Sequence, residues 1–201
     1  MHPKIFIIGF NKTATRSLDY FFKGNKLLTV HHDKNRLAKV LERNTMLGKK
    51  LLSSGTTRGG RKYEELTVFS DMTNATTLQE SMHYYKGLDK DYPGSKFILN
   101  IRDTESWITS RFKHAAGQLY RNHLEFLNLK DDEQGREILK QVYSKMHNDH
   151  HKDVLNYFKD RKHDLVVFDI HKDDISKIIE FLRDYYTLDP RYYKHIGKTK
   201  I

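Results

Sequence analysis

The sequence predicts an α/β fold in three layers, with a central parallel sheet of about five strands flanked by helices. Five short apolar runs alternate with stretches in which apolar residues recur at helical spacing. The runs are apolar throughout, which is typical of parallel strands covered on both faces. With no internal repeat, no low-complexity tract and 3 prolines, nothing marks a linker, so we expect a single domain over residues 1–201.

The amino-terminal half alternates strands and helices. Strands are expected at 4–9, 27–30 and 66–69. A helix should follow the first strand and end at Gly24, and another should follow the second strand. The apolar positions of these two helices are Leu18, Phe21, Phe22, Leu37, Val40, Leu41 and Leu47. A glycine-rich basic loop at 55–62 is expected either to close over a ligand or to form an exposed surface loop.

The carboxy-terminal half continues the pattern. A strand is expected at 96–101 and another at 165–170, and two long helices are expected at 104–127 and 133–158. Asp173 is expected to cap a last helix. Its inward positions are Ile175, Ile178, Ile179 and Leu182. Ligands of such sheets bind beyond the carboxyl ends of the strands, so the residues there are the candidates for function.

The composition sets limits on compartment and partners. No apolar run approaches the roughly 20 residues that span a bilayer, and the apolar start of the chain is too short for a signal-peptide core, so we expect a cytoplasmic protein without a membrane partner. The chain has no cysteine, which excludes disulfides and thiolate chemistry. A formal charge of +10 favours anionic partners but does not choose among nucleic acid, lipid and nucleotide.

A candidate anion site follows the first strand. In the segment Gly9–Leu18, small and hydroxyl residues stand where a helix begins, and the first N–H groups of a helix are available to an anion. Lys12 adds a full positive charge. The hydroxyl donors are Thr13, Thr15 and Ser17. Because Asn11 stands where a Walker loop has glycine, a standard nucleoside-triphosphate loop is disfavoured.

A second candidate anion site follows the fourth strand. Arg102 stands at the strand end, and Ser106 and Ser110 lie one helical turn apart on the same face of the next helix. A guanidinium beside hydroxyl groups suits a phosphate monoester. Taken alone, Arg102 could pair with Asp103 and Ser110 could face solvent. Two such sites at the ends of two strands favour ligand binding.

Together the two sites resemble the signatures of the sulfotransferases that use 3'-phosphoadenosine 5'-phosphosulfate (PAPS). In that family a strand is followed by Gly, two variable residues, Lys, small residues and Thr. The residues that fit this pattern, in the variant of the heparan and small bacterial-type branches, are Gly9, Lys12, Thr15, Arg16 and Leu18. Arg102 and Ser110 fit the family's second signature, an arginine and a serine eight positions on. Ala14 departs from the first signature, because glycine is usual at that position.

The resemblance covers residues 4–24 and 66–114 and implies a fold like that of the P-loop NTPases. It implies transfer of a sulfuryl group from PAPS to a hydroxyl or amine acceptor, such as a carbohydrate or small molecule, without a metal. The implied nucleotide-binding residues are Asn11, Lys12, Thr13, Ala14, Thr15, Arg16, Ser17, Arg102 and Ser110. The first site would hold the 5'-phosphosulfate and the second the 3'-phosphate.

The resemblance also implies two catalytic roles. Lys12 would stabilise the bridging oxygen as its bond to sulfur breaks. A general base would take the acceptor's proton, and the candidates at neighbouring strand ends are His31, His32 and Asp71. Asp71 and His32 rank equally, since Asp71 fits a segment of one family branch and an imidazole titrates close to neutrality.

Other interpretations stay open. Lys12 could serve a magnesium-dependent nucleotide phosphotransferase, or the chain could bind nucleotide without catalysis. A basic nucleic-acid-binding protein is disfavoured because no recognition pattern is present. His147, His150 and His151 could hold a metal, but a solvated helix face is expected. The segment 195–200 weakly resembles the late basic stretch with which some sulfotransferases grip the 3'-phosphate.

Overall fold

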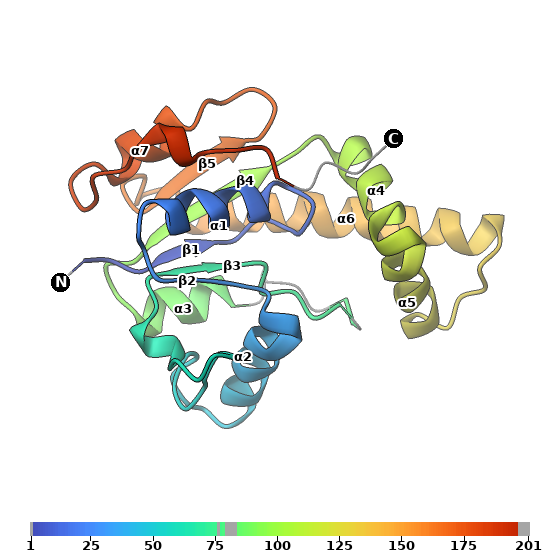
Figure 1. Cartoon of the computed structure of the whole chain (residues 1–201). Coiled ribbons are helices and arrows are strands. Elements are labelled where there is room, and N and C mark those ends of the chain that lie inside the picture. Colours follow the sequence, from blue (N-terminus) through green and yellow to red (C-terminus); the bar gives the residue numbers. More distant parts are fainter. Residues whose placement is uncertain (1, 76, 79–83, 197–201) are drawn as a thin grey trace.

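The computed structural model describes residues 2–75, 77–78 and 84–196 and contains the expected parallel sheet (Figure 1). The strands are β1 (Ile5–Ile7), β2 (Thr29–His31), β3 (Val68–Ser70), β4 (Lys96–Ile101) and β5 (Leu165–Asp169). Their order is β2-β3-β1-β4-β5, and every neighbouring pair is parallel. The first strand is therefore central, and its carboxyl end lies at the middle of the sheet edge.

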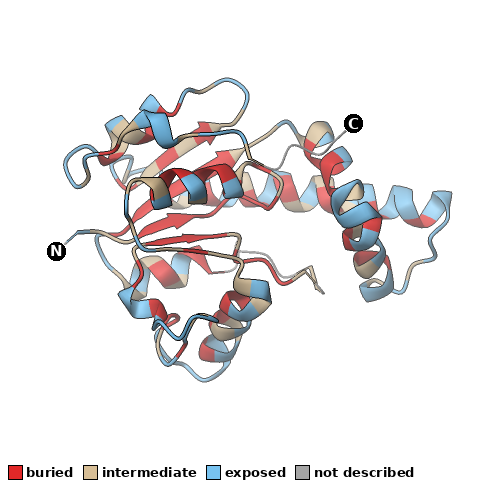
Figure 2. Cartoon of the chain, viewed as in Figure 1, coloured by how far each residue is buried: buried red, intermediate tan, exposed pale blue. Residues whose placement is uncertain are grey.

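Helices cover both faces of the sheet. Successive side chains of a strand point to opposite faces, and in β1 the side chains on both faces are apolar and have to be buried. Ile5 and Ile7 pack with α1 (Thr15–Gly24) and α7 (Ser176–Leu182). Phe6 packs on the other face, between Phe69 of β3 and Phe97 of β4, with their ring centroids 5.1 and 5.5 Å away. The helices on that side are α2 (Arg36–Met46), α3 (Tyr85–Asp91) and the end of α6 (Glu133–Tyr157). This arrangement confirms the predicted three-layer α/β class, and Figure 2 shows the buried residues concentrated in the strands and the helix faces against them.

A third apolar cluster lies beyond the carboxyl ends of the strands. It joins α4 (Thr104–Phe112), α5 (Gln118–Phe126) and the first half of α6. Its buried members are Phe10, Trp107, Ile108, Leu124, Leu139 and Tyr143. Because Phe10 follows β1 directly, this cluster anchors the segment that carries the first candidate anion site.

Two sequence predictions about helices were wrong. The helix expected at 104–127 is two helices, α4 and α5, separated by the short 3₁₀ turn His114–Gly117. Ala115, Ala116 and Gly117 have φ angles of 51°, 52° and 84°, which end the right-handed helix. Asp173 does not cap α7: its carboxylate accepts from the Asp169 N–H and pairs with Lys177, and α7 begins only at Ser176.

The histidines of α6 also differ from expectation. His147 and His150 are 2% and 3% exposed, and His151 is half-buried, so they do not form a solvated face. They pack around the Phe10 ring, and His150 Nε2 donates to the Ile8 carbonyl at 2.7 Å. Hydropathy alone places histidine at the surface, whereas here the rings close the third cluster.

None of the helices in the described part of the chain has both the length and the apolar character needed to cross a membrane.

Candidate functional site

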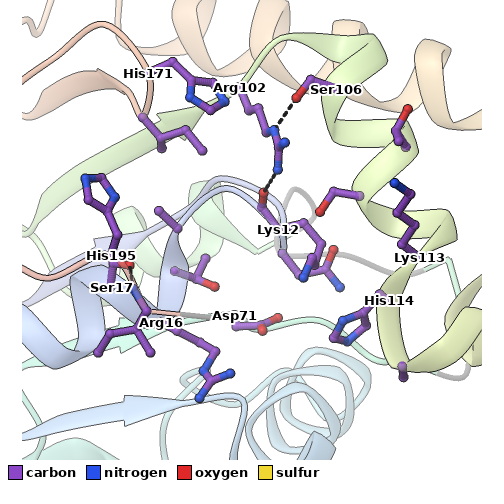
Figure 3. Close-up of a pocket in the computed structure, with 18 residues that line it drawn as sticks. Lys12, Arg16, Ser17, Asp71, Arg102, Ser106, Lys113, His114, His171 and His195 are labelled. Carbon is purple, nitrogen blue, oxygen red and sulfur yellow. Dashed lines mark hydrogen bonds between the residues drawn. The ribbon is translucent and has the colours of Figure 1, made fainter. Parts of the chain in front are cut away.

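A crevice of about 850 Å³ opens at the carboxyl ends of the strands (Figure 3). Its walls come from the loops after β1, β3, β4 and β5, from the turn after α4, and from residues 195–196. Every predicted nucleotide-binding residue except Thr13 lines it: Asn11, Lys12, Ala14, Thr15, Arg16, Ser17, Arg102 and Ser110. The two anion sites predicted from separate strands therefore face one cavity.

Asn100, the penultimate residue of β4, fixes the loop after β1. The Gly9 N–H donates to Asn100 Oδ1 at 2.9 Å, and Asn100 Nδ2 donates to the Thr13 carbonyl at 2.7 Å and to Thr13 Oγ1 at 2.6 Å. A β-carbon on Gly9 would lie 2.0 Å from the Asn100 carbonyl oxygen, so glycine is required by this close approach. Thr13, which is fully buried, supports the loop from behind.

Arg102, directly after β4, and Trp107 of α4 donate to carbonyl groups of the loop. The Asn11 carbonyl accepts from Trp107 Nε1 at 2.9 Å, and the Lys12 carbonyl accepts from Arg102 Nη1 at 3.3 Å. In a trans peptide the N–H points opposite to the carbonyl, so the N–H groups that follow are turned away from these donors. Lys12 and Ala14 have φ angles of 66° and 64°, an alternation that forms anion-binding concavities.

The first turn of α1 completes the cradle. The first of its backbone bonds runs from Leu18 N–H to the Ala14 carbonyl, so the preceding N–H groups have no acceptor within the helix. Thr15 and Ser17 are buried there, whereas Arg16 is exposed. This geometry provides backbone donors, hydroxyl groups and the positive end of a helix dipole at one point.

The crevice concentrates positive charge. Burial lowers the pKa of Lys12, and the nearby Arg102 and Arg16 lower it further, whereas Asp71 raises it. Burial also lowers the pKa of Arg102. Cations that are partly desolvated and repel one another are stabilised when an anion enters. The electrostatics therefore favour a ligand with more than one negative charge.

Arg102 links the two predicted sites. Its Nε donates to Ser106 Oγ at 2.7 Å while its Nη1 holds the Lys12 carbonyl. Ser110, one helical turn beyond Ser106, is 7% exposed and lines the same wall. The Asp103 carboxylate caps α4 by accepting from the Ser106 N–H at 2.9 Å. The guanidinium thus joins the β1 loop to the second signature.

A family model described as a sulfotransferase domain matches residues 4–187, a range that includes the five strands of the described sheet and both candidate anion sites. The chain belongs to the sulfotransferase family. The family establishes a transferase activity, and its α/β architecture agrees with the observed sheet. A search of curated proteins finds no significant match.

In this sulfotransferase the candidate bases occupy different positions. Asp71 lines the crevice, with its Oδ2 3.6 Å from His31 Nε2; its Oδ1 is buried and has no hydrogen-bond partner in the described part of the chain. His32 lies outside the crevice lining, and its Nε2 is 2.6 Å from Asn35 Oδ1. Of the two candidate bases, Asp71 therefore shares the crevice with Lys12, whereas His32 does not line it.

Two residues of the sulfotransferase site were missed by the sequence analysis. Arg111 is fully buried; its guanidinium donates to Asn11 Oδ1 at 3.0 Å and stacks over Trp107 and Tyr143 at 4.8 and 4.5 Å. His114 lines the crevice from the turn after α4. A helix was expected through both positions, so no signal in the sequence distinguished them from surface residues.

The carboxy-terminal segment also reaches the crevice. His195 and Ile196 line it, and the Ile196 N–H donates to Ser17 Oγ at 2.9 Å. The Ser17 oxygen thus accepts from the protein, while its hydroxyl hydrogen can still be donated. The predicted anion-gripping stretch continues through residues 197–200, which lie outside the described residues.

Two other features considered in the sequence analysis, the loop 55–62 and a metal site, do not contribute to the described crevice of this sulfotransferase. The loop 55–62 forms a small hairpin whose Arg58 N–H contacts the Asp33 carboxylate, and no residue of it lines the crevice. Among the residues placed by the structure, no three histidine or carboxylate side chains are grouped so that they could hold a metal.

Proposed function

We propose that the protein transfers a sulfuryl group from PAPS to a hydroxyl or amine acceptor. One observation carries the proposal: the Lys12 loop and the Arg102–Ser110 pair, from two different strands, line one crevice. PAPS carries a phosphosulfate at one end and a phosphate at the 3' position, so two cationic clusters in one cavity suit it. We also propose that this reaction takes place in the cytoplasm, as expected from the sequence.

The residues present fit such a ligand. The loop supplies backbone N–H groups and Lys12 for the phosphosulfate, and the crevice volume of about 850 Å³ lies within the range of small-molecule sites. Arg102 supplies a planar donor, and Ser110 a hydroxyl, for the 3'-phosphate. Ala14 narrows the approach to the loop by one methyl group relative to the family's usual glycine.

The proposed reaction needs charge stabilisation at one oxygen. As the acceptor attacks sulfur, the bond between sulfur and the bridging oxygen breaks, and negative charge collects on that oxygen. Lys12 and the N–H groups after it are the donors nearest to the proposed position. Adenosine 3',5'-bisphosphate is the leaving group.

Calorimetry with adenosine 3',5'-bisphosphate and with magnesium ATP tests the assignment. We expect the bisphosphate to bind more tightly, and Lys12→Ala and Arg102→Ala each to weaken it by about tenfold or more, since a hydrogen bond to a charged group contributes about 1.5–3 kcal/mol. Lys23→Ala, an exposed lysine in the last turn of α1, is the control and should leave the affinity unchanged.

The competing functions predict different results. A magnesium-dependent phosphotransferase would bind magnesium ATP in preference to the bisphosphate, and that result would overturn the proposal. A nucleic-acid-binding protein would leave bisphosphate affinity low and would bind DNA or RNA with a steep salt dependence.

A further inference from the structure

We propose that His114 takes the proton from the acceptor during sulfuryl transfer, and that Asp71 stabilises the imidazolium that forms. This inference rests on the proposed function and names a base other than those that strand ends suggest. It begins from the place of His114 in the crevice, where it lies with Asp71 and Lys12 (Figure 3).

The backbone brings His114 to the crevice by an unusual path. α4 ends at Phe112, and the chain turns through His114–Gly117 before α5 begins. Ala115 and Ala116 both have left-handed φ angles, a conformation that L-residues avoid and that is found at functional sites. The turn sets Lys113, His114 and Ala115 against the crevice.

Four charged or titratable groups, each from a different part of the chain, act on the His114 ring. These groups are Lys12 after β1, His32 after β2, Asp71 after β3 and Arg111 in α4. In Figure 3 the Asp71 carboxylate and the His114 ring point toward one another, with Lys12 beside them. Burial, Lys12, Arg111 and His32 lower the pKa of His114, whereas Asp71 raises it. On balance the pKa of His114 lies below its ordinary value, which favours the neutral imidazole, the form that accepts a proton.

The step balances with the groups named. A bond forms between the acceptor oxygen and sulfur, and the bond from sulfur to the bridging oxygen breaks, with its electron pair passing to the bisphosphate. The acceptor's proton moves to an imidazole nitrogen of His114. Neighbouring groups partly desolvate the ring, but the residue keeps exposed surface, so the proton can then pass to solvent.

Asp71 is placed to stabilise a protonated imidazole. Its Oδ2 lies 3.6 Å from His31 Nε2, and its negative charge raises the pKa of His114 across the crevice. A nearby opposite charge favours the protonated form of an imidazole ring.

Transfer assays separate the two roles. Radiolabelled PAPS is supplied with 2-naphthol, glucosamine or water as the probe acceptor, and the release of label is measured. His114→Gln should lower the turnover number by about 100-fold or more, the usual contribution of a general base, while affinity for adenosine 3',5'-bisphosphate stays unchanged. His163→Gln, a histidine exposed far from the crevice, is the matched control.

The pH profile adds a readout that a structural role would not move. The wild-type rate should fall on acidification as His114 becomes protonated, below the ordinary imidazole range near 6.5. That fall should vanish in His114→Gln. In Asp71→Asn it should move to lower pH, because Asp71 raises the pKa of His114. Loss of transfer in Asp71→Asn with activity retained in His114→Gln would make Asp71 the base and overturn the inference.

A measurement that needs no acceptor tests the inference if none of the probe acceptors reacts. The His114 ring signal is followed by NMR with and without adenosine 3',5'-bisphosphate. The added negative charge should shift the signal and raise the pKa of His114. A ring unaffected by bound bisphosphate would contradict the inference even if no probe acceptor reacts. Failure of the bisphosphate to bind at all would instead overturn the proposed function.

Discussion

The loop after β1 contains a residue, Ala14, whose backbone conformation lowers the stability of the protein. Ala14 is the N-cap of α1 with φ at 64° and makes no side-chain cap. An L-residue in this region costs roughly 1–2 kcal/mol, which glycine avoids. The loop keeps this strain because the Asn100 and Arg102 bonds hold its backbone on both sides.

Replacing Ala14 by glycine should therefore stabilise the protein. We expect Ala14→Gly to raise the free energy of unfolding by about 0.5–1 kcal/mol, because relief of strain exceeds the entropy added to the unfolded chain. Denaturant titration measures the change. Ala38→Gly, at a right-handed position in α2, should do the opposite, and equal effects at the two sites would contradict the explanation.

Asn100 is the residue on which the loop geometry depends most. Asn100→Ala removes three hydrogen bonds and leaves the Gly9 N–H without its acceptor, so we expect a loss of about 2–3 kcal/mol in unfolding free energy together with weaker bisphosphate binding. Asn156→Ala, an exposed position near the end of α6, should change neither quantity. A stable Asn100→Ala variant with full affinity would show that the loop holds its shape by other means.

Among the elements, α6 joins the site to the core. Its histidines pack on Phe10, and the His147 and His151 ring centroids are 4.0 Å apart. Burial lowers the pKa of His147 to about 4 and of His151 to about 3. The Nε2 atoms of both rings are buried and lack hydrogen-bond partners among the described residues. Protonating either ring would place an unpaired charge in the third cluster.

Stability should therefore fall as the pH is lowered. The folded pKa values lie below the ordinary value near 6.5, so between pH 6.5 and 4 the unfolded chain binds more protons, and each histidine contributes a slope of up to ~1.4 kcal/mol per pH unit. Urea titrations across this window measure the slope. His151→Leu should reduce it by one histidine's share, whereas His163→Leu should not; identical slopes for all three proteins would exclude this cause.

At the scale of the whole molecule, three apolar clusters share one sheet and one long helix. The first and third clusters are joined by α6, and the first and second share the strands. Such shared elements favour one cooperative unit over separate domains. A single domain over residues 1–201 stays a prediction at this scale.

Cooperative unfolding tests that prediction. Trp107, the chain's 1 tryptophan, lies in the third cluster, so its fluorescence reports the packing of α4, α5 and the first half of α6 beyond the carboxyl ends of the strands. We expect its denaturation midpoint to coincide with that of the far-ultraviolet circular dichroism, which reports all helices and strands. Separate midpoints would indicate that α4, α5 and the start of α6 unfold as an independent unit.

The local features of this fold were predictable because they depend on neighbouring residues. Each apolar run became a strand, and the strand-turn-helix at Gly9–Leu18 follows from a short stretch of sequence. The seven-residue α3 was missed because only Tyr85 and Leu88 mark its buried face. The break after α4 was missed because alanines favour helix, and here tertiary packing overrides that preference.

The sequence by itself determined the class of the sheet, the two candidate anion sites and the family resemblance, since each depends on short stretches of consecutive residues. Only the tertiary structure decided that both candidate sites line one crevice, that Arg111 donates to Asn11 across 100 positions of the chain, and that Asp71 and His114 line the same crevice as Lys12. The physical reason is that contacts between distant segments are set by the packing of the whole core, which no local pattern specifies.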